Sequence, residues 1–108
     1  MGQKILVVSK DPNLIGGLKS ILGNDGYEVI EADTAIGALE ASRGYLFENV
    51  VIDACHMGIN SNELCDEIKS GGRTKVSGYI APGSEAPEMT SFDLVFTDIN
   101  DILKSLRT

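Results

Sequence analysis

The chain has 108 residues, of which 43% are apolar, and a formal net charge of −7 at pH 7. This length and composition predict one globular domain with a single core, covering residues 1–108. The acidic balance repels phosphate backbones and anionic lipid surfaces, so neither a nucleic acid nor a membrane is an expected partner.

The sequence also limits the compartment and the chemistry. No apolar run is long enough to span a bilayer, and the chain enters its first strand without the core of a signal peptide, so a cytoplasmic location is expected. Cys55 and Cys65 lie ten positions apart, and His56 is the only histidine of the chain. Because this spacing fits neither a CxxC redox pair nor a zinc site, no metal and no cofactor is expected.

Five apolar runs of strand length occur at residues 4–8, 27–31, 49–53, 76–81 and 93–96. Segments with a helical period separate most of them, and this alternation predicts an α/β fold with a parallel sheet. The first helix is expected after Asp11, which can cap it, with Pro12 in its first turn and with Gly23 and Gly26 at its end.

The next two helices have ordinary signals. Thr34 can cap the second, which ends at Gly44, and Asn60 or Ser61 can cap the third, which closes at Gly71. After residue 81 the pattern changes, because residues 83–91 contain a proline and few apolar side chains. The fourth connection is therefore expected to be a loop or one short turn, followed by a last helix that begins near residue 98.

Two segments carry a resemblance to a known family. They are GYEVIEADTAIGALEA at residues 26–41 and VVIDACHMGINSNELCDEIK at residues 50–69. With the first strand and its Asp-Pro-capped helix, they resemble the receiver domains of two-component response regulators over residues 3–70. The resemblance implies a flavodoxin-like, doubly wound sheet of five parallel strands in the order 2-1-3-4-5, here with the fourth helix missing or reduced to a loop.

Asp53 falls on the position of the family's phosphoacceptor aspartate. In a typical receiver two acids and a main-chain carbonyl hold Mg²⁺ beside this aspartate, and a lysine and a hydroxyl bind the phosphoryl group. The carboxyl ends of the first and third strands meet at the switch point of such a sheet, so Ser9, Lys10 and Asp53 are expected to be neighbours.

The partners of Asp53 depart from the family pattern. Ser9 and Lys10 replace the acid pair, Ala81 stands where a switch Thr or Ser is expected, and Thr97 lies where the family has Lys-Pro. We therefore expect that the Lys10 ammonium takes the place of the metal ion and pairs with the carboxylate of Asp53.

These departures favour a pseudo-receiver, which is not an enzyme and acts by recognising a signalling protein such as a histidine kinase, a sister domain or its own copy. One alternative is an active receiver that a histidine kinase phosphorylates on Asp53, with Asp11 as an acidic metal ligand, although Asp11 is also fully explained as a helix cap. Another is an unrelated flavodoxin-like enzyme that uses the thiol of Cys55 or Cys65.

The shortened fourth connection predicts a partner surface at the fourth and fifth strands and the final helix. Without a full helix there, apolar side chains of this region would remain exposed, and the residues assigned to the surface are Tyr79, Met89, Phe92 and Phe96. The alternative is that the loop folds back tightly and closes the sheet, with Met89 and Phe92 filling the space.

Overall fold

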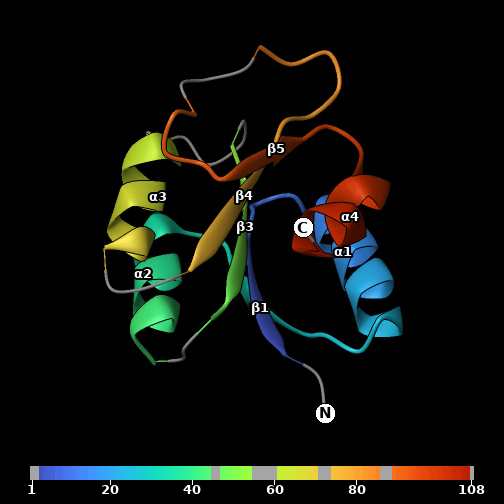
Figure 1. The fold of residues 1–108 in the computed structure, drawn as a ribbon, viewed down its shortest axis with the longest axis horizontal. Helices are drawn as coiled ribbons and strands as arrows, with labels where there is room; N and C mark the ends of the chain where they lie inside the picture. The colour runs from blue at the N-terminus through green and yellow to red at the C-terminus, as the bar shows by residue number, and fades with distance from the viewer. Residues whose placement is uncertain (1–2, 45–46, 55–60, 71–73, 86–88, 108) are drawn as a thin grey trace.

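The computed structural model describes residues 3–44, 47–54, 61–70, 74–85 and 89–107. Five strands form one parallel sheet in the order β2-β1-β3-β4-β5 (Figure 1). The strands are β1 (Lys4–Val8), β2 (Glu28–Ala32), β3 (Asn49–Asp53), β4 (Lys75–Tyr79) and β5 (Leu94–Phe96). The flavodoxin-like doubly wound fold predicted from the sequence is therefore confirmed.

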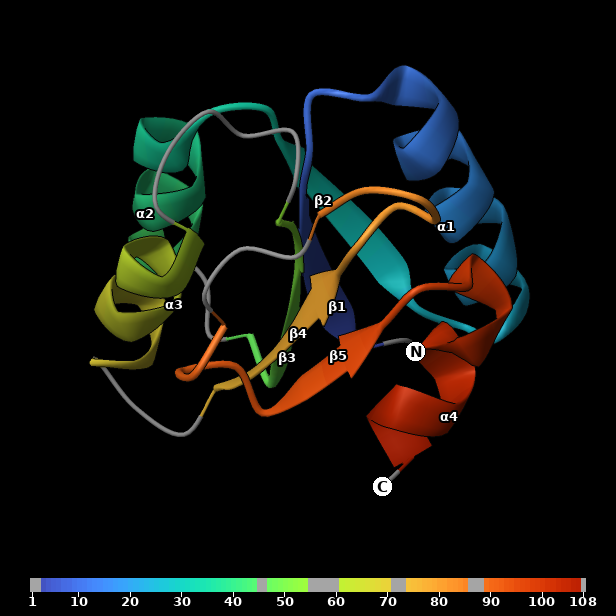
Figure 2. The ribbon, with the colours of Figure 1, turned by 90° about the horizontal axis from the view of Figure 1, so that it is seen from above.

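The helices lie in two layers, one on each face of the sheet. In chain order they are α1 (Pro12–Asn24), α2 (Ala35–Gly44), α3 (Ser61–Lys69), the 3₁₀ turn η1 (Ile99–Asp101) and α4 (Ile102–Arg107). Figure 2 shows α2 and α3 over one face and α1 and α4 over the other. No helix occurs between β4 and β5 in the described part of that connection, as expected. Among the described helices, none has the length and apolar character needed to cross a membrane.

The start of α1 follows directly from its sequence. The Asp11 carboxylate accepts a hydrogen bond from the Asn13 N–H at 3.0 Å, and Pro12 occupies the first turn, where its missing N–H is harmless. Leu14, Leu18 and Leu22 share the buried side of the helix. The local signals and the apolar period thus agree, and together they fix the path of the chain from β1 to β2.

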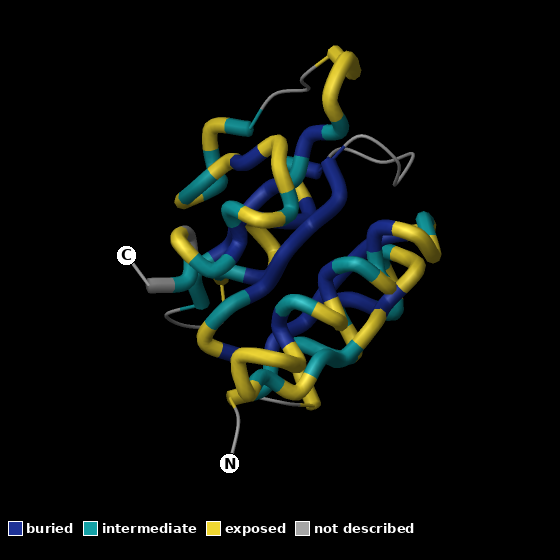
Figure 3. Tube along the Cα trace, turned by 90° about the vertical axis from the view of Figure 1, so that its right-hand side faces the viewer, coloured by how far each residue is buried: buried dark blue, intermediate teal, exposed yellow. Residues whose placement is uncertain are grey.

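The core consists of two apolar clusters, one on each face of the sheet. One packs beneath α2 and α3, and the other packs beneath α1 and α4. The strands β1 and β3 contribute to both clusters and are buried almost throughout, as Figure 3 shows by the dark tube at the centre. Because both faces are covered, these strands read as continuous apolar runs in the sequence, and their polar residues are confined to their ends.

Candidate functional site

The site begins at the carboxyl ends of β1 and β3, which lie side by side in the sheet. The hydroxyl of Ser9, the residue after β1, donates a hydrogen bond to Oδ2 of Asp53, the last residue of β3, at 2.8 Å. Both residues are buried, and Asp53 is only 1% exposed. The expected proximity of Ser9 and Asp53 is therefore confirmed, and their contact is a buried hydrogen bond.

The same hydroxyl also holds the loop that leads into α1. Ser9 Oγ accepts a hydrogen bond from the Asp11 N–H at 3.0 Å, while the Asp11 carboxylate caps α1 through Asn13. Ser9 thus connects the end of β3 to the start of α1. The interpretation of Asp11 as a helix cap is confirmed, because one of its carboxylate oxygens is engaged there.

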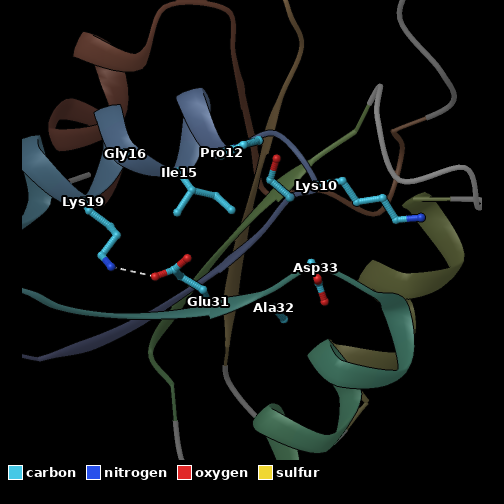
Figure 4. Close-up of a pocket in the computed structure, with 9 residues that line it drawn as sticks. Lys10, Pro12, Ile15, Gly16, Lys19, Glu31, Ala32 and Asp33 are labelled. Carbon is cyan, nitrogen blue, oxygen red and sulfur yellow. Dashed lines mark hydrogen bonds and ion pairs between the residues drawn. The ribbon is translucent and has the colours of Figure 1, made fainter.

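Lys10 lies differently from the expectation. Its side chain is exposed, and it forms no ion pair with Asp53 among the interactions of the described residues. Figure 4 shows it extended away from Lys19 and Glu31. The expected direct Lys10–Asp53 ion pair is therefore not found. The shorter Ser9 side chain reaches the carboxylate from inside the fold, whereas the Lys10 ammonium stays in water, where a charge is cheapest to keep.

Two hollows flank this edge of the sheet. The larger, of about 630 Å³, lies between α1 and the end of β2, and an ion pair of 2.6 Å between Lys19 and Glu31 crosses it (Figure 4). Its lining residues are Ser9, Lys10, Pro12, Ile15, Gly16, Lys19, Glu31, Ala32 and Asp33.

The second hollow, of about 500 Å³, brings together three of the positions singled out in the sequence, namely Asp11, Ala81 and Thr97. Ala81 offers no hydroxyl, and Thr97 is exposed. Three of the positions singled out in the sequence therefore line one hollow at the carboxyl edge of the sheet.

The comparisons with solved structures agree with this architecture. The receiver domain of a sensor histidine kinase from Pseudomonas aeruginosa, with a magnesium ion coordinated in its cleft, superposes with a TM-score of 0.86 at 16% identity, over 99% of this chain and 96% of that one. The response regulator TrrA from Thermotoga maritima, in complex with Mg²⁺ and BeF, gives 0.83 at 22% identity, over 97% and 96%. The chain has the receiver-domain fold.

The chemotaxis protein CheY4 of Vibrio cholerae is a further similar structure, with a TM-score of 0.83 at 17% identity over 99% of this chain and 98% of that one. No family model matches the sequence, and no curated protein matches it either. The likeness is therefore one of fold, and the chemistry of the site has to be argued from its residues.

The described residues beside Asp53 do not fit the magnesium ion that the receiver fold implies. Mg²⁺ requires oxygen ligands in octahedral geometry. Ser9 already donates its proton to Asp53 and accepts a bond from the loop, and the Lys10 ammonium has no lone pair to offer. Among the described residues, no three acidic, histidine or cysteine side chains converge. Asp53 alone does not make this a magnesium site.

Cys65 does not support the thiol-enzyme alternative. The side chain is buried in α3, and its Sγ donates a weak hydrogen bond to the Ser91 carbonyl at 3.4 Å. Burial raises the pKa of the Cys65 thiol to about 11, so its nucleophilic thiolate is scarce at neutral pH. Cys55 and His56 lie outside the described residues.

The four residues predicted as one partner surface lie on opposite faces of the sheet. Tyr79 and Phe96 stack on the α1 and α4 face, with ring centroids 5.4 Å apart, and Phe96 is buried. Met89 and Phe92 pack over Gly78, and Phe92 joins the cluster on the α2 and α3 face. The four do not form one continuous surface. Residues 89–93 instead follow the alternative prediction, in which the loop folds back and its side chains fill the space over the sheet.

Proposed function

We propose that this chain is a receiver-type recognition module of two-component signalling that has exchanged the phosphorylation site for an internal hydrogen bond. The observation that carries the proposal is the bond from Ser9 to the buried Asp53. At a position where the family has a metal-binding acid, this chain places a donor that satisfies the phosphoacceptor carboxylate directly.

The surroundings of Asp53 support the same proposal. A carboxylate that attacks a phosphoryl donor needs a cation, because like charges must otherwise approach each other. Lys10, which follows Ser9 directly, is exposed and forms no direct ion pair with Asp53 among the interactions of the described residues. Ala81 and Thr97 provide no cation at the ends of β4 and β5, where the phosphoryl group would be held.

Such a module acts through its surface. A solved structure of similar fold contains the response regulator TrrA together with the histidine kinase ThkA, with a TM-score of 0.82 at 23% identity over 97% of this chain and 96% of that one. The proposed partner of this chain is accordingly a signalling protein: a histidine kinase, a sister domain or a second copy. Sedimentation of the purified chain over a range of concentrations identifies the last of these.

A magnesium titration, followed by amide NMR, tests the loss of the site. The wild-type chain is compared with a Ser9→Asp, Lys10→Asp double variant, which restores the acid pair on the same scaffold. We expect that millimolar Mg²⁺ and beryllofluoride leave the amide signals of the wild type near residue 53 in place and shift those of the double variant.

Shifts of the wild-type signals near residue 53 on addition of Mg²⁺ and beryllofluoride would favour the active-receiver alternative. A magnesium response in neither protein would mean that positions 9 and 10 do not determine the loss. A Ser9→Asp, Lys10→Asn double variant serves as the matched control, because at position 10 it removes the ammonium without adding an acid.

A further inference from the structure

Residues 89–93, called here the 89–93 turn, form a closed turn that lies against α3. The Phe92 N–H donates a hydrogen bond to the Met89 carbonyl at 3.2 Å, which is the bond that closes a four-residue turn. Figures 1 and 2 both place this segment between α3 and β5. Because its own main chain closes it, the turn is a compact unit that the rest of the fold holds from outside.

The helix α3 binds the main chain of this turn at Ser91. The Asn62 side chain accepts from the Ser91 N–H at 2.7 Å and donates to the Thr90 hydroxyl at 3.2 Å. The Cys65 thiol and the Lys69 ammonium donate to the Ser91 carbonyl, at 3.4 and 3.2 Å. Positions 62, 65 and 69 lie on one side of a helix, so α3 presents a row of polar groups. The N–H and carbonyl that they bind are groups that a peptide offers whatever its side chain at that position.

The strand β4 supplies an apolar floor for the first and fourth positions of the turn. A Cβ atom at Gly78 would collide with the Met89 side chain and would come within 2.8 Å of the Phe92 ring. Glycine inside a strand often marks a place where another segment approaches closely, and here these two side chains do so. Phe92 also packs against the buried cluster beneath α2 and α3. The two positions are therefore bound as apolar anchors.

The fifth position of the turn is bound through its charge. The Asp93 carboxylate accepts from the Lys69 ammonium at 2.9 Å and from the Val76 N–H at 2.8 Å, and the Asp93 N–H donates to the Val76 carbonyl at 2.9 Å. Hydrogen bonds to an ionised acceptor are the stronger ones, so an acid is favoured at this position. The α3–β4 seat, which consists of residues 62, 65, 69, 76 and 78, thus fits a turn of the pattern apolar-x-x-aromatic-acid.

The polar contacts that hold the turn in this seat are only partly shielded from water. The side chains of Lys69 and Asp93 are 33% and 35% exposed, and Thr90 is exposed. Ion pairs in such positions contribute little, and the two anchors of the turn are only half-buried. The seat beneath them is fully buried at Cys65 and Val76. A segment held in this way opens locally at a lower free energy than the whole fold.

We propose that the α3–β4 seat is a binding site for a turn of a partner protein with the pattern apolar-x-x-aromatic-acid, and that the 89–93 turn occupies it as an intramolecular competitor. The connection between β4 and β5 has no helix in its described part, which leaves the seat to this short segment. A partner binds only when the seat is open, so the tethered turn lowers the partner's apparent affinity by the open fraction. The inference rests on the proposed function and names the chemistry of the partner that this module recognises.

A peptide added in trans tests whether the seat binds such a turn. The peptide is acetyl-Met-Thr-Ser-Phe-Asp-amide, which has the sequence of residues 89–93. The protein is the full chain with Met89→Ala and Phe92→Ala, which removes both anchors of the tethered turn and leaves the seat intact. So short a ligand should bind in the millimolar range, where amide NMR shifts of residues 62–69 report binding directly.

Two controls separate the seat from other effects. The control peptide has alanine in place of its phenylalanine, which removes the larger anchor. The control protein carries Asn62→Ala in addition to the two substitutions, because this change removes the side chain that contacts the main chain of the turn.

The peptide should shift the signals of residues 62–69 in the double variant, and the control peptide and the control protein should each bind about tenfold more weakly. The wild type should also respond about tenfold more weakly, because its own turn is present at a high effective concentration. In a Cys55→Ser background Cys65 is the only thiol of the chain, and half-saturating peptide should slow its labelling by DTNB about twofold.

The proposal is overturned if the double variant, folded by circular dichroism, shows no shift of residues 62–69 with peptide. If that variant does not fold, Met89→Ala alone takes its place under the same criterion. A double variant that forms dimers in sedimentation without binding the peptide also overturns the proposal, in favour of exchange of this segment between copies. None of these readouts involves Mg²⁺ or phosphorylation, so a failure here is distinguishable from a failure of the proposed function.

Discussion

Replacement of Ser9 by alanine removes the contact on which the account of the site depends. The hydroxyl is fully buried, donates to a buried carboxylate and accepts one main-chain N–H. A hydrogen bond to a charged group contributes about 1.5–3 kcal/mol, and the N–H of the partly exposed Asp11 can turn to water at little further cost. We therefore expect Ser9→Ala to lower the free energy of unfolding by about 2–3 kcal/mol, which for a domain of this size is a fall of about 10 °C in Tm.

Urea denaturation and calorimetry measure this loss, with Ser20→Ala as the control. Ser20 is an exposed residue of α1, and the same chemical change there should alter stability by at most about 0.5 kcal/mol. If Ser9→Ala proves no more costly than Ser20→Ala, the bond to Asp53 does not stabilise the fold, and the argument that Ser9 satisfies that carboxylate fails.

Three further predictions concern the rest of the fold. Partial burial raises the pKa of Asp93, but its hydrogen bonds from a β4 N–H and an α3 lysine outweigh this and hold the pKa below its ordinary value. Its contribution to stability is therefore present above the ordinary pKa of an aspartate and is lost as the pH falls through the lowered pKa. The urea stabilities of the wild type and Asp93→Asn should therefore approach each other over that fall in pH. Gly16→Ala should stabilise the fold by about 0.5–1 kcal/mol, because the added Cβ meets open space. Gly17→Ala should stabilise it less or not at all, because the added Cβ would come within 2.9 Å of Ile99. Thermal unfolding of the two variants measures the difference. Asp11→Ala should cost about 1 kcal/mol in the same assay through loss of the cap, and an unchanged Tm would show that the cap is not needed.

The sequence predicted the sheet well because its signals are local and strong. Buried parallel strands are continuous apolar runs, and the Asp-Pro pair before α1 sets the first crossover. The proximity of Asp53 at the end of β3 and Ser9 directly after β1 followed from the strand order that the family resemblance implies. The shortened connection after β4 was also readable, because its composition does not sustain a helix.

The sequence could not predict which side chain would reach Asp53. Ser9 and Lys10 are adjacent, and opposite charge favoured the lysine, but burial decided for the smaller hydroxyl. A loop without hydrophobic periodicity gives no signal for the face of the sheet that it covers. The sequence therefore led to one predicted surface for Met89 and Tyr79, although the two lie on opposite sides of the sheet. Alternation along β4 could have warned of this, since residues 78 and 79 point to opposite faces.

The most direct test of the central claim is the intact mass of the purified wild-type chain after incubation with acetyl phosphate and Mg²⁺. The Ser9→Asp, Lys10→Asp variant and an Asp53→Asn variant are treated in parallel. The account predicts that the mass of the wild type is unchanged, because Asp53 is buried and bonded to Ser9 and, in the part of the chain that the structure describes, no fitting magnesium site lies beside it. A wild-type adduct with the mass of one phosphoryl group, absent from Asp53→Asn, would contradict it.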